Sequence, residues 1–284
     1  MIKQITLVLI SHKSKELILE FIKNLSDNCK ILVIENSSDF QLEKEIKNYN
    51  NVEIKFMNNN GYGAAINYAR EFVKSRYFFV FSPDLKNVDD SLIEMFEEKV
   101  KIIKEFGALG PRFLNVIEKS HRQSNKDEEI GKINSISGSA MCFDTITFDK
   151  VGGFDENIFL YFEETDYCIR ANKKGYKMYQ INKATVEHPR GVSEGVVKIK
   201  NLREMSNLEK LYSWHFVWSK YYVYKKHYGK LITILYFIPT LIRIIFRINL
   251  YKYKKNINKK EKYQVRLDGL ISSIKGTKSI KRLL

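Results

Sequence analysis

Short apolar runs that alternate with segments of helical spacing restrict the fold of the first 81 residues more than any other feature of the chain. Residues 5–10 form an uninterrupted apolar run that ends at Ser11 and His12, a pattern typical of a strand buried on both faces. Helical spacing begins at Ser14, and residues 31–34 give a second buried strand. The unit repeats, with strands predicted at 52–56 and 77–81 and a helix at 64–74. This alternation predicts a mainly parallel, doubly wound α/β sheet. Further strands are predicted at 109–112 and 136–143, with a polar loop over 115–130 between them.

Composition and cysteine usage are typical of a globular intracellular protein. The 284 residues suit one large α/β domain with an extension, or two modest domains, and 44% hydrophobic residues suffice for a sizeable core. The three cysteines, Cys29, Cys142 and Cys168, match neither a disulfide framework nor a zinc pattern, so a reducing cytoplasm is expected. The first apolar run is too short for a signal peptide, and no cleavage site follows it.

The net charge of +15 is confined to the C-terminal third of the chain. Residues 191–284 carry 21 Lys and Arg against 5 Asp and Glu, whereas residues 1–190 carry 27 against 28. We therefore predict an α/β domain over residues 1–195 and a basic helical extension over residues 196–284. Such an extension indicates an anionic partner, such as nucleic acid, a membrane surface or a phosphorylated substrate.

Polar clusters follow three of the predicted strands and should converge at one edge of the sheet. Ser11 and His12 follow the first strand, residues 35–39 the second and residues 82–84 the fourth. Ligands of doubly wound sheets bind at this carboxyl edge. The chain has neither a G-x-G-x-x-G sequence after the first strand nor a P-loop, which argues against dinucleotide and P-loop nucleotide sites. Residues 59–67 suit either an anion site at a helix start or a tight turn into a packed helix.

Three carboxylates, Glu163, Glu164 and Asp166, lie within four residues between aromatic side chains. Crowding and partial burial raise carboxylate pKa values, which suits a general base that works near neutral pH. The alternative is a solvated helix start in which Asp166 pairs with Arg170 four residues later.

Taken in order, these segments resemble family 2 glycosyltransferases of the GT-A fold, especially the bacterial branch that assembles surface polysaccharides and includes rhamnosyltransferases. The resemblance covers roughly residues 4–195, and its specificity comes from the ordered set because each motif is weak alone. The matching segments are residues 33–39, Asn59-x-Gly61-Tyr62-Gly63-x-x-x-Asn67, Phe81-Ser82-Pro83-Asp84, Gly138-Ser139-Ala140-Met141, Gly152-Gly153-Phe154-Asp155, residues 159–170 with Gly175-Tyr176-Lys177, and His188.

The resemblance implies a nucleotide-sugar donor bound along the strand ends. In the family, an acidic residue after the second strand contacts the nucleobase, and Glu35 occupies that position. The other donor-binding candidates are Ser11, His12, Asp39, Asn59, Gly61, Asn67, Asp84 and Gly138.

A divalent metal, Mg²⁺ or Mn²⁺, is also implied, because the family's D-x-D-like motif holds one against the diphosphate. Here the motif reads Ser82-Pro83-Asp84, so the site depends on Asp84, with His188 as second protein ligand. A lone histidine is otherwise more often structural. One or two protein ligands are enough when diphosphate oxygens and water complete the coordination shell.

The family's catalytic base is usually the aspartate of a Glu-Asp pair, and the matching residue is Glu164. The resemblance therefore implies Glu164 as base, Asp166 as the alternative base and Glu163 as support. It also implies inversion at the anomeric carbon, through direct attack by an acceptor hydroxyl.

Two helices are predicted in the extension, over residues 202–228 and 231–250. The first carries an aromatic stripe that suits either packing against the catalytic domain or a membrane interface. In the second, only twelve residues precede Arg243, too few to span a bilayer, and a polar stripe indicates an in-plane amphipathic helix. The stripe comprises Thr233, Tyr236, Thr240, Arg243 and Arg247, and lysines at 252, 254, 255, 259 and 260 follow it.

These features predict a cytoplasmic enzyme attached peripherally to the inner face of the plasma membrane, where saccharide acceptors are carried on polyprenyl diphosphates. Burial of the second helix in a homodimer is the alternative. A nucleic-acid-binding or anionic-membrane-binding protein without catalysis is the alternative function. The sequence has no recognition-helix, zinc-finger or sheet-aromatic signature, so no nucleic-acid partner is expected.

The Ser-Pro-Asp form of the metal motif is most similar to the branch that uses dTDP-rhamnose, although UDP-sugar enzymes share the scaffold. The resemblance thus implies transfer of rhamnose or another hexose to a saccharide in capsule, O-antigen or other cell-surface polysaccharide synthesis.

Overall fold

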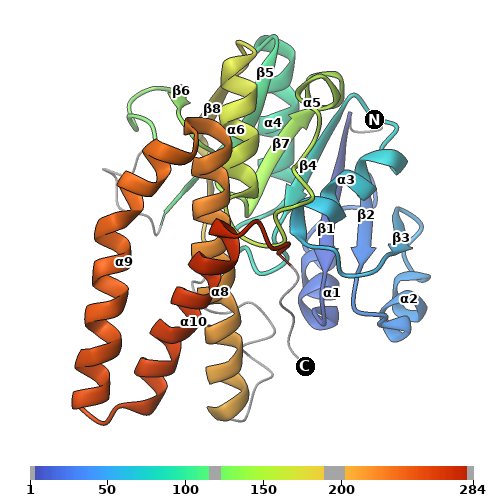
Figure 1. The fold of residues 1–284 in the computed structure, drawn as a ribbon. Coiled ribbons are helices and arrows are strands. Elements are labelled where there is room, and N and C mark those ends of the chain that lie inside the picture. The colour runs from blue at the N-terminus through green and yellow to red at the C-terminus, as the bar shows by residue number, and fades with distance from the viewer. Residues whose placement is uncertain (1–3, 115–122, 189–201, 280–284) are drawn as a thin grey trace. The chain divides into compact units, whose positions relative to one another are not determined.

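A mixed eight-stranded sheet organises the first part of the chain in the computed structural model, which describes residues 4–114, 123–188 and 202–279 (Figure 1). The strand order is β3-β2-β1-β4-β7-β5-β8-β6, with β1 to β4 mutually parallel and β7 antiparallel to its neighbours. The strands are β1 (Ile5–Ser11), β2 (Lys30–Glu35), β3 (Val52–Phe56), β4 (Tyr77–Phe81), β5 (Phe106–Phe113), β6 (Ile130–Ile133), β7 (Ala140–Asp144) and β8 (Lys177–Val186).

Helices cover both faces of this sheet because each strand of its centre is apolar on both sides. One face packs against α1 (Lys15–Lys23), α2 (Phe40–Ile46) and α4 (Asp90–Ile102). The other face packs against α3 (Tyr62–Phe72), α5 (Thr145–Val151) and α6 (Glu163–Lys173). The result is a three-layer α/β/α unit, as the alternating sequence pattern predicts.

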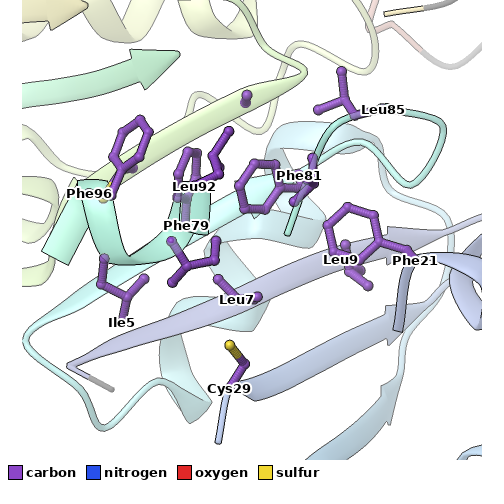
Figure 2. Packing of buried hydrophobic residues seen from close by; sticks show 14 of the residues in the cluster. Ile5, Leu7, Leu9, Phe21, Cys29, Phe79, Phe81, Leu85, Leu92 and Phe96 are labelled. Atoms are coloured by element: carbon purple, nitrogen blue, oxygen red, sulfur yellow. The ribbon is translucent and has the colours of Figure 1, made fainter. Parts of the chain in front are cut away.

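Aromatic side chains fill the core on both faces. Figure 2 shows Phe79 and Phe81 of β4 beside Leu7 and Leu9 of β1, with Phe96 of α4 over Phe79. The ring centroids of Phe79 and Phe81 are 3.9 Å apart, and those of Phe79 and Phe96 are 4.3 Å apart. This packing holds β1 and β4 in register, so their carboxyl ends lie at one edge of the sheet.

On the second face, Tyr167 anchors α6 to the sheet. It is fully buried, contacts Phe143 of β7 edge-on with ring centroids 5.2 Å apart, and donates a hydrogen bond to the Gly107 carbonyl at 3.0 Å. Because Tyr167 lies one turn after Glu163 and Glu164, this anchor also fixes the helix turn that carries both carboxylates.

The chain divides into two compact units that are discontinuous in sequence. The first contains residues 1–154 and 164–198, and the second contains residues 155–163 and 199–284. The second unit is built from α8 (Leu202–Tyr228), α9 (Lys230–Tyr253) and α10 (Ile257–Ile274). A nine-residue segment from the middle of the chain thus belongs to the C-terminal helical unit.

Within the helical unit, α10 packs against both α8 and α9 (Figure 1). Trp214 donates from its indole nitrogen to Asp268 at 2.7 Å, and Trp218 donates to the Thr277 carbonyl at 2.9 Å. Both tryptophans and Tyr221 are buried. These three residues therefore pack within the helical unit itself, whereas the sequence interpretation expected packing against the catalytic domain.

The α9 helix has an outward face that is more apolar than the sequence pattern indicated. In the predicted polar stripe, Thr233 is buried, Thr240 and Arg247 are half-buried, and Tyr236 and Arg243 are exposed, so the stripe does not form one solvent-facing side. The exposed residues include Leu231, Ile232, Leu235, Ile238, Ile242, Ile245 and Phe246. Among the helices of the described ranges, α9 is the one that is long and apolar enough, by length and composition, to cross a membrane.

Several elements differ from the sequence expectations. The strand predicted at 136–143 is β7 and starts at Ala140, because residues 138–139 form a turn, and the strand predicted at 109–112 is the longer β5. Of the predicted loop over 115–130, residues 115–122 lie outside the described residues and Ile130 begins β6. The elements that sequence reasoning did not predict are α2, α4, α5, α10, β6 and β8.

The crossing of α8 and α10 gives a stability prediction. An added Cβ on Gly269 would lie 2.6 Å from the Trp214 carbonyl oxygen, a backbone atom that cannot move away alone. Gly269→Ala should therefore lower the stability of the helical unit, although the same change ordinarily stabilises a helix interior by up to about 1 kcal/mol. Thermal unfolding followed by far-UV circular dichroism measures the effect. Gln264→Ala, an exposed change in the same helix, should be neutral, and a stabilised Gly269→Ala protein would contradict the close crossing.

Candidate active site

The carboxyl ends of β1 and β2 bring Ser11 and Glu35 side by side. The parallel register pairs Ser11 with Glu35, and the Asn36 amide donates to the Ser11 carbonyl at 3.0 Å. Both side chains are fully buried. The sequence prediction that polar residues at these strand ends converge is correct for this pair.

Glu35 is a buried carboxylate in which one oxygen, Oε1, is hydrogen-bonded. Its Oε1 accepts hydrogen bonds from the amide and the hydroxyl of Ser37. Its Oε2 is among the few buried side-chain oxygens of the described residues that have no hydrogen-bond partner. A buried carboxylate oxygen of this kind is costly unless a ligand donor satisfies it, so Glu35 has the chemistry of a binding residue.

His12 and Asn59 lie beside this pair. His12 Nδ1 lies 2.8 Å from Asn36 Oδ1 and 3.5 Å from Asn59 Nδ2. The loops after β1, β2 and β3 therefore meet at one place, whereas the sequence predicted convergence of the loops after the first, second and fourth strands. Asn36 and Ser37 contact these residues and lie within the motif of residues 33–39, but neither was predicted as a site residue.

Asp39 and Gly61 each begin a helix. The Asp39 carboxylate caps α2 by accepting from the amides of Gln41 and Leu42 at 3.1 and 3.3 Å. Gly61 is the N-cap of α3 with φ of 110°, a conformation that favours glycine. Asp39 thus shapes the loop after β2, while Gly61 provides no side chain to cap the first turn of α3.

Asp84 and His188 lie together although 104 positions separate them. A backbone bridge between Lys86 and Glu187 holds the two loops, and His188 Nε2 lies 3.5 Å from Asp84 Oδ1. Ser82 donates to the same oxygen at 2.6 Å. Burial alone would raise the pKa of Asp84, but hydrogen bonds from His188 and Ser82 outweigh it and hold this pKa below its ordinary value.

This arrangement is compatible with a divalent cation. No group of three or more His, Cys, Asp or Glu side chains suited to a metal occurs in the described ranges, so a cation here would need ligands from elsewhere. A carboxylate oxygen and an imidazole nitrogen 3.5 Å apart supply two ligands, which is enough where diphosphate oxygens and water complete the shell.

The loop of residues 137–139 links the remaining site residues. Tyr62, at the start of α3, donates to the Gly138 carbonyl at 2.9 Å, and the Ser82 amide donates to the Ser139 carbonyl at 2.7 Å. A Cβ added to Gly138 would lie 3.9 Å from Glu164 Oε2. The loop thus connects the start of α3, the Asp84 loop and the Glu164 carboxylate. The hydroxyl of Tyr62 gave no sequence signal beyond its place in a motif.

Glu164 lies in the first turn of α6 and is 8% exposed. A helix N-terminus favours an anionic side chain because its first amides point toward it. Two residues in the left-handed region, Tyr161 and Phe162 with φ of 67° and 69°, lead into this turn. Left-handed aromatic residues each cost roughly 1 to 3 kcal/mol and are kept where surrounding contacts enforce them. Glu163 is also buried and belongs to the helical unit.

Asp166 is fully buried and paired with Arg170. Arg170 Nε donates to Asp166 Oδ2 at 2.8 Å, and its two terminal nitrogens donate to the carbonyls of Val151 and Gly153 at 2.8 and 2.6 Å. The pairing at i,i+4 that sequence reasoning offered as the alternative interpretation is therefore present, and it gives Asp166 a structural contact.

Asn67 also bonds the backbone of the loop that follows α5. Its amide nitrogen donates to the Phe154 carbonyl at 3.0 Å, and its Oδ1 accepts from the Phe154 amide at 2.8 Å. Both amide atoms are thus committed to the backbone of the loop that precedes the acidic segment. Asn67 lies on α3 like Gly61, but this geometry describes a residue that fixes the loop.

Comparison with known proteins identifies the family from the first unit. The model of the family described as Glycosyl transferase family 2 matches residues 6–149, which is just over half of the chain. The chain belongs to glycosyl transferase family 2. The matched region contains every strand-end residue described above except His188, and it stops before the acidic cluster of α6.

Relatives of this family 2 glycosyltransferase include three named transferases. A low-salt glycan biosynthesis hexosyltransferase of Haloferax volcanii is 21% identical over 68% of this chain and 70% of its own length. A rhamnosyltransferase of Escherichia coli is 21% identical over 62% of this chain and 79% of its own length. An N-acetylglucosaminyl-diphospho-decaprenol L-rhamnosyltransferase of Mycobacterium tuberculosis is 28% identical, over 40% of this chain and 38% of its own length.

A solved structure confirms the GT-A fold of this family 2 glycosyltransferase. A mannosyltransferase of Pyrobaculum calidifontis, solved with GDP-mannose and Mn²⁺, superposes with a TM-score of 0.60 at 11% identity. The superposition covers 95% of this chain and 87% of the other. The chain is thus a glycosyltransferase with a GT-A sheet and C-terminal helices.

The Asp166 ion pair gives the prediction for this site. Arg170→Met would leave a fully buried carboxylate without its cation, a change that typically costs about 3 to 5 kcal/mol. Urea unfolding measures the free energy, and Arg70→Met is the matched control because its partner Asp149 is 53% exposed, so that loss should stay below about 1 kcal/mol. Adding Asp166→Asn to Arg170→Met should recover part of the loss. Equal effects of the two arginine changes would argue against a structural role for Asp166.

Proposed function

We propose that the protein transfers a sugar from a nucleotide-sugar to a saccharide acceptor with inversion at the anomeric carbon, and that Glu164 is the general base. The observation that supports this proposal most is the position of the buried Glu164 carboxylate beside Gly138. The residue after Gly138, Ser139, accepts a hydrogen bond from the amide of Ser82, which lies in the Asp84 loop. Gly138 and Ser139, two adjacent residues of one loop, thus link the proposed proton acceptor to the loop that carries the proposed diphosphate-binding carboxylate.

Glu35 supports the donor part of the proposal. Its buried, unpartnered Oε2 suits the imide N–H of a uracil or thymine base. Ser11, His12 and Asn59 lie around it at the same sheet edge and supply polar atoms for the nucleoside. The N-terminus of α3 at Gly61, which no side chain caps, suits an anionic group of the donor.

Asp84 and His188 would hold a divalent metal, Mg²⁺ or Mn²⁺, against the donor diphosphate. When bound, the metal would act as a Lewis acid that stabilises the departing nucleotide diphosphate. Asp84 suits this role because its lowered pKa keeps it ionised below the ordinary titration range of aspartate.

The chemical step is a single displacement. The acceptor hydroxyl gives its proton to Glu164 while its oxygen forms a bond to C1 of the sugar. The bond between C1 and the diphosphate oxygen breaks, and the nucleotide diphosphate leaves with the electron pair. Attack from the opposite face inverts the configuration at C1.

We further propose dTDP-rhamnose as donor and an N-acetylglucosaminyl-diphospho-lipid as acceptor, in the synthesis of a cell-surface polysaccharide. The names of two relatives support this choice. One is a rhamnosyltransferase, and the other is an N-acetylglucosaminyl-diphospho-decaprenol L-rhamnosyltransferase. A UDP-hexose donor is the alternative, because the hexosyltransferase relative is not restricted by its name to rhamnose.

The base assignment predicts the behaviour of Glu164→Gln. Because the amide cannot accept the proton, transfer to a synthetic N-acetylglucosaminyl-diphospho-lipid should fall at least a hundredfold, while donor affinity in calorimetry stays within about twofold. Asp166→Asn is the comparison. An active Glu164→Gln protein together with an inactive, folded Asp166→Asn protein would move the base to Asp166.

The donor site predicts a selective thermal shift. In a panel of dTDP-rhamnose, UDP-glucose, UDP-N-acetylglucosamine and UDP-galactofuranose, the true donor should raise the melting temperature with Mn²⁺ or Mg²⁺, and much less with a chelator. Glu35→Gln should weaken the shift under both conditions, whereas Asp84→Asn should remove only the part that depends on metal. A shift in the Asp84→Asn protein that still depends on metal would contradict the proposed metal site.

We also propose that α9 attaches the enzyme to the cytoplasmic face of the plasma membrane, lying in the interface. Its outward residues form an apolar strip, and Lys252, Lys254, Lys255, Lys259 and Lys260 follow at its end. Each such cation contributes about 1 kcal/mol of attraction near an anionic leaflet. Attachment would place the enzyme beside acceptors carried on lipids.

The packing of α9 supports an in-plane position over a spanning one. Phe237 and Ile244 of α9 face inward, and α10 and α8 pack along the helix. These partners carry ion pairs, Lys210 with Glu261 and Lys262 with Glu209. Insertion of α9 across a bilayer would either break its packing against α8 and α10 or bring these charged helices to the membrane, and each charge that entered the hydrocarbon would cost a few kcal/mol.

Co-sedimentation with vesicles tests this attachment. The full-length protein should bind vesicles of phosphatidylglycerol and phosphatidylcholine at low salt, and binding should weaken as salt screens the lysines. A Leu235→Glu/Ile242→Glu double change should lower binding at least tenfold, whereas Ile102→Glu, an equally exposed apolar position on α4, should not. Protein that stays in solution, or oligomerises with concentration through α9 and ignores vesicles, would contradict the proposal and favour the homodimer alternative.

A further inference from the structure

One face of α8 holds the segment of residues 155–162, and both belong to the helical unit. The contacts come from α8 positions spaced three or four residues apart, which is the spacing of one helix face. These positions are Tyr212, His215, Phe216, Ser219, Tyr222 and Lys226. The segment runs antiparallel to α8, because its first residue contacts the C-terminal end of the helix.

Asp155 fixes the beginning of this segment. Its Oδ2 accepts from the Tyr222 hydroxyl at 2.9 Å and from Lys226 Nζ at 2.6 Å, while its Oδ1 accepts from the backbone and side-chain amides of Asn157. Burial would raise the pKa of Asp155, but the bonds from Lys226 and Asn157 lower it to about 2. The Asp155 carboxylate is therefore ionised near neutral pH and available to pair with Lys226.

The end of the segment is held by a backbone bond and by aromatic rings. Ser219 donates to the Leu160 carbonyl at 2.8 Å. Phe216 contacts the rings of Tyr161 and Phe162 edge-on, with centroids 5.7 and 5.2 Å away. These are the two left-handed residues that precede α6, so α8 supplies contacts that keep them in an unfavourable conformation.

We propose that α8 is a positioning element for the general base: Tyr222 and Lys226 hold Asp155, Ser219 holds Leu160, and Phe216 holds Tyr161 and Phe162, so that α6 begins with Glu164 correctly aimed. The inference rests on the proposed function, since it takes Glu164 as the base. It assigns a catalytic purpose to a helix that lies outside the region matched by the family model. Geometry at a reacting centre is sensitive to displacements of about an ångström, so loosening this segment should affect the rate more than donor binding.

The test compares rate and affinity in the full-length protein. With dTDP-rhamnose and a synthetic N-acetylglucosaminyl-diphospho-lipid, the Tyr222→Phe/Lys226→Met double variant should lower kcat ten- to hundredfold, with the donor Kd from calorimetry within about twofold. Lys226→Arg, which keeps the charge and the hydrogen bond to Asp155, should retain at least a third of kcat. Lys225→Met removes the same charge from the neighbouring position and should leave both values unchanged.

The outcomes separate this inference from the base assignment. Inactive Glu164→Gln with normal kcat in the double variant would overturn the positioning role and keep the base. Active Glu164→Gln would remove the base and the positioning role with it. A parallel loss of kcat and donor affinity would show a merely structural role and also overturn the inference. If the double variant does not fold, Ser219→Ala should lower kcat about threefold or more, and an unchanged rate would count against the proposal.

Discussion

The attachment of α6 to the sheet is the constraint on which the rest of the site depends. Tyr167 buries its ring against Phe143 and bonds the Gly107 carbonyl, while Arg170 joins Asp166 to the carbonyls of Val151 and Gly153. Neither contact touches the proposed reacting groups. Together they fix one helix turn so that the acidic cluster meets the Gly138 loop, and buried polar bonds of this kind specify one arrangement because any other leaves a charge unpaired.

The strand-helix alternation was enough to predict the parallel half of the sheet and the pairing of Ser11 with Glu35 at its carboxyl edge. It was not enough for β6 and β8, because these strands mix polar and apolar residues and border a buried amide network around Gln180 and Asn182. Asp39 and Asn67 show the limit for single residues. Their motif positions suggested ligand contacts, which stay predictions, and the geometry adds a helix cap and a loop bond that spacing alone cannot reveal.

The charge asymmetry acquires a physical meaning from the two units. The α/β unit is nearly neutral and forms its site from buried, individually bonded carboxylates, whereas the helical unit carries the excess of lysine and arginine. In α9 Thr233 is buried and Arg247 is half-buried, whereas Arg243 stays exposed among the outward apolar side chains. Sequence periodicity identified a polar stripe correctly but could not determine which side of the helix its neighbours would cover.

The interleaved division of the chain bears on how this protein could have diversified. Residues 155–163 belong to the helical unit yet lie between two parts of the α/β unit, so no single crossover point in the gene separates one unit from the other. If relatives exchanged their C-terminal helices, Asp155, Tyr161 and Phe162 would face α8 residues that do not match them. Lineages that change their helices should therefore change this short internal stretch in concert, and the two regions are expected to be inherited as one module.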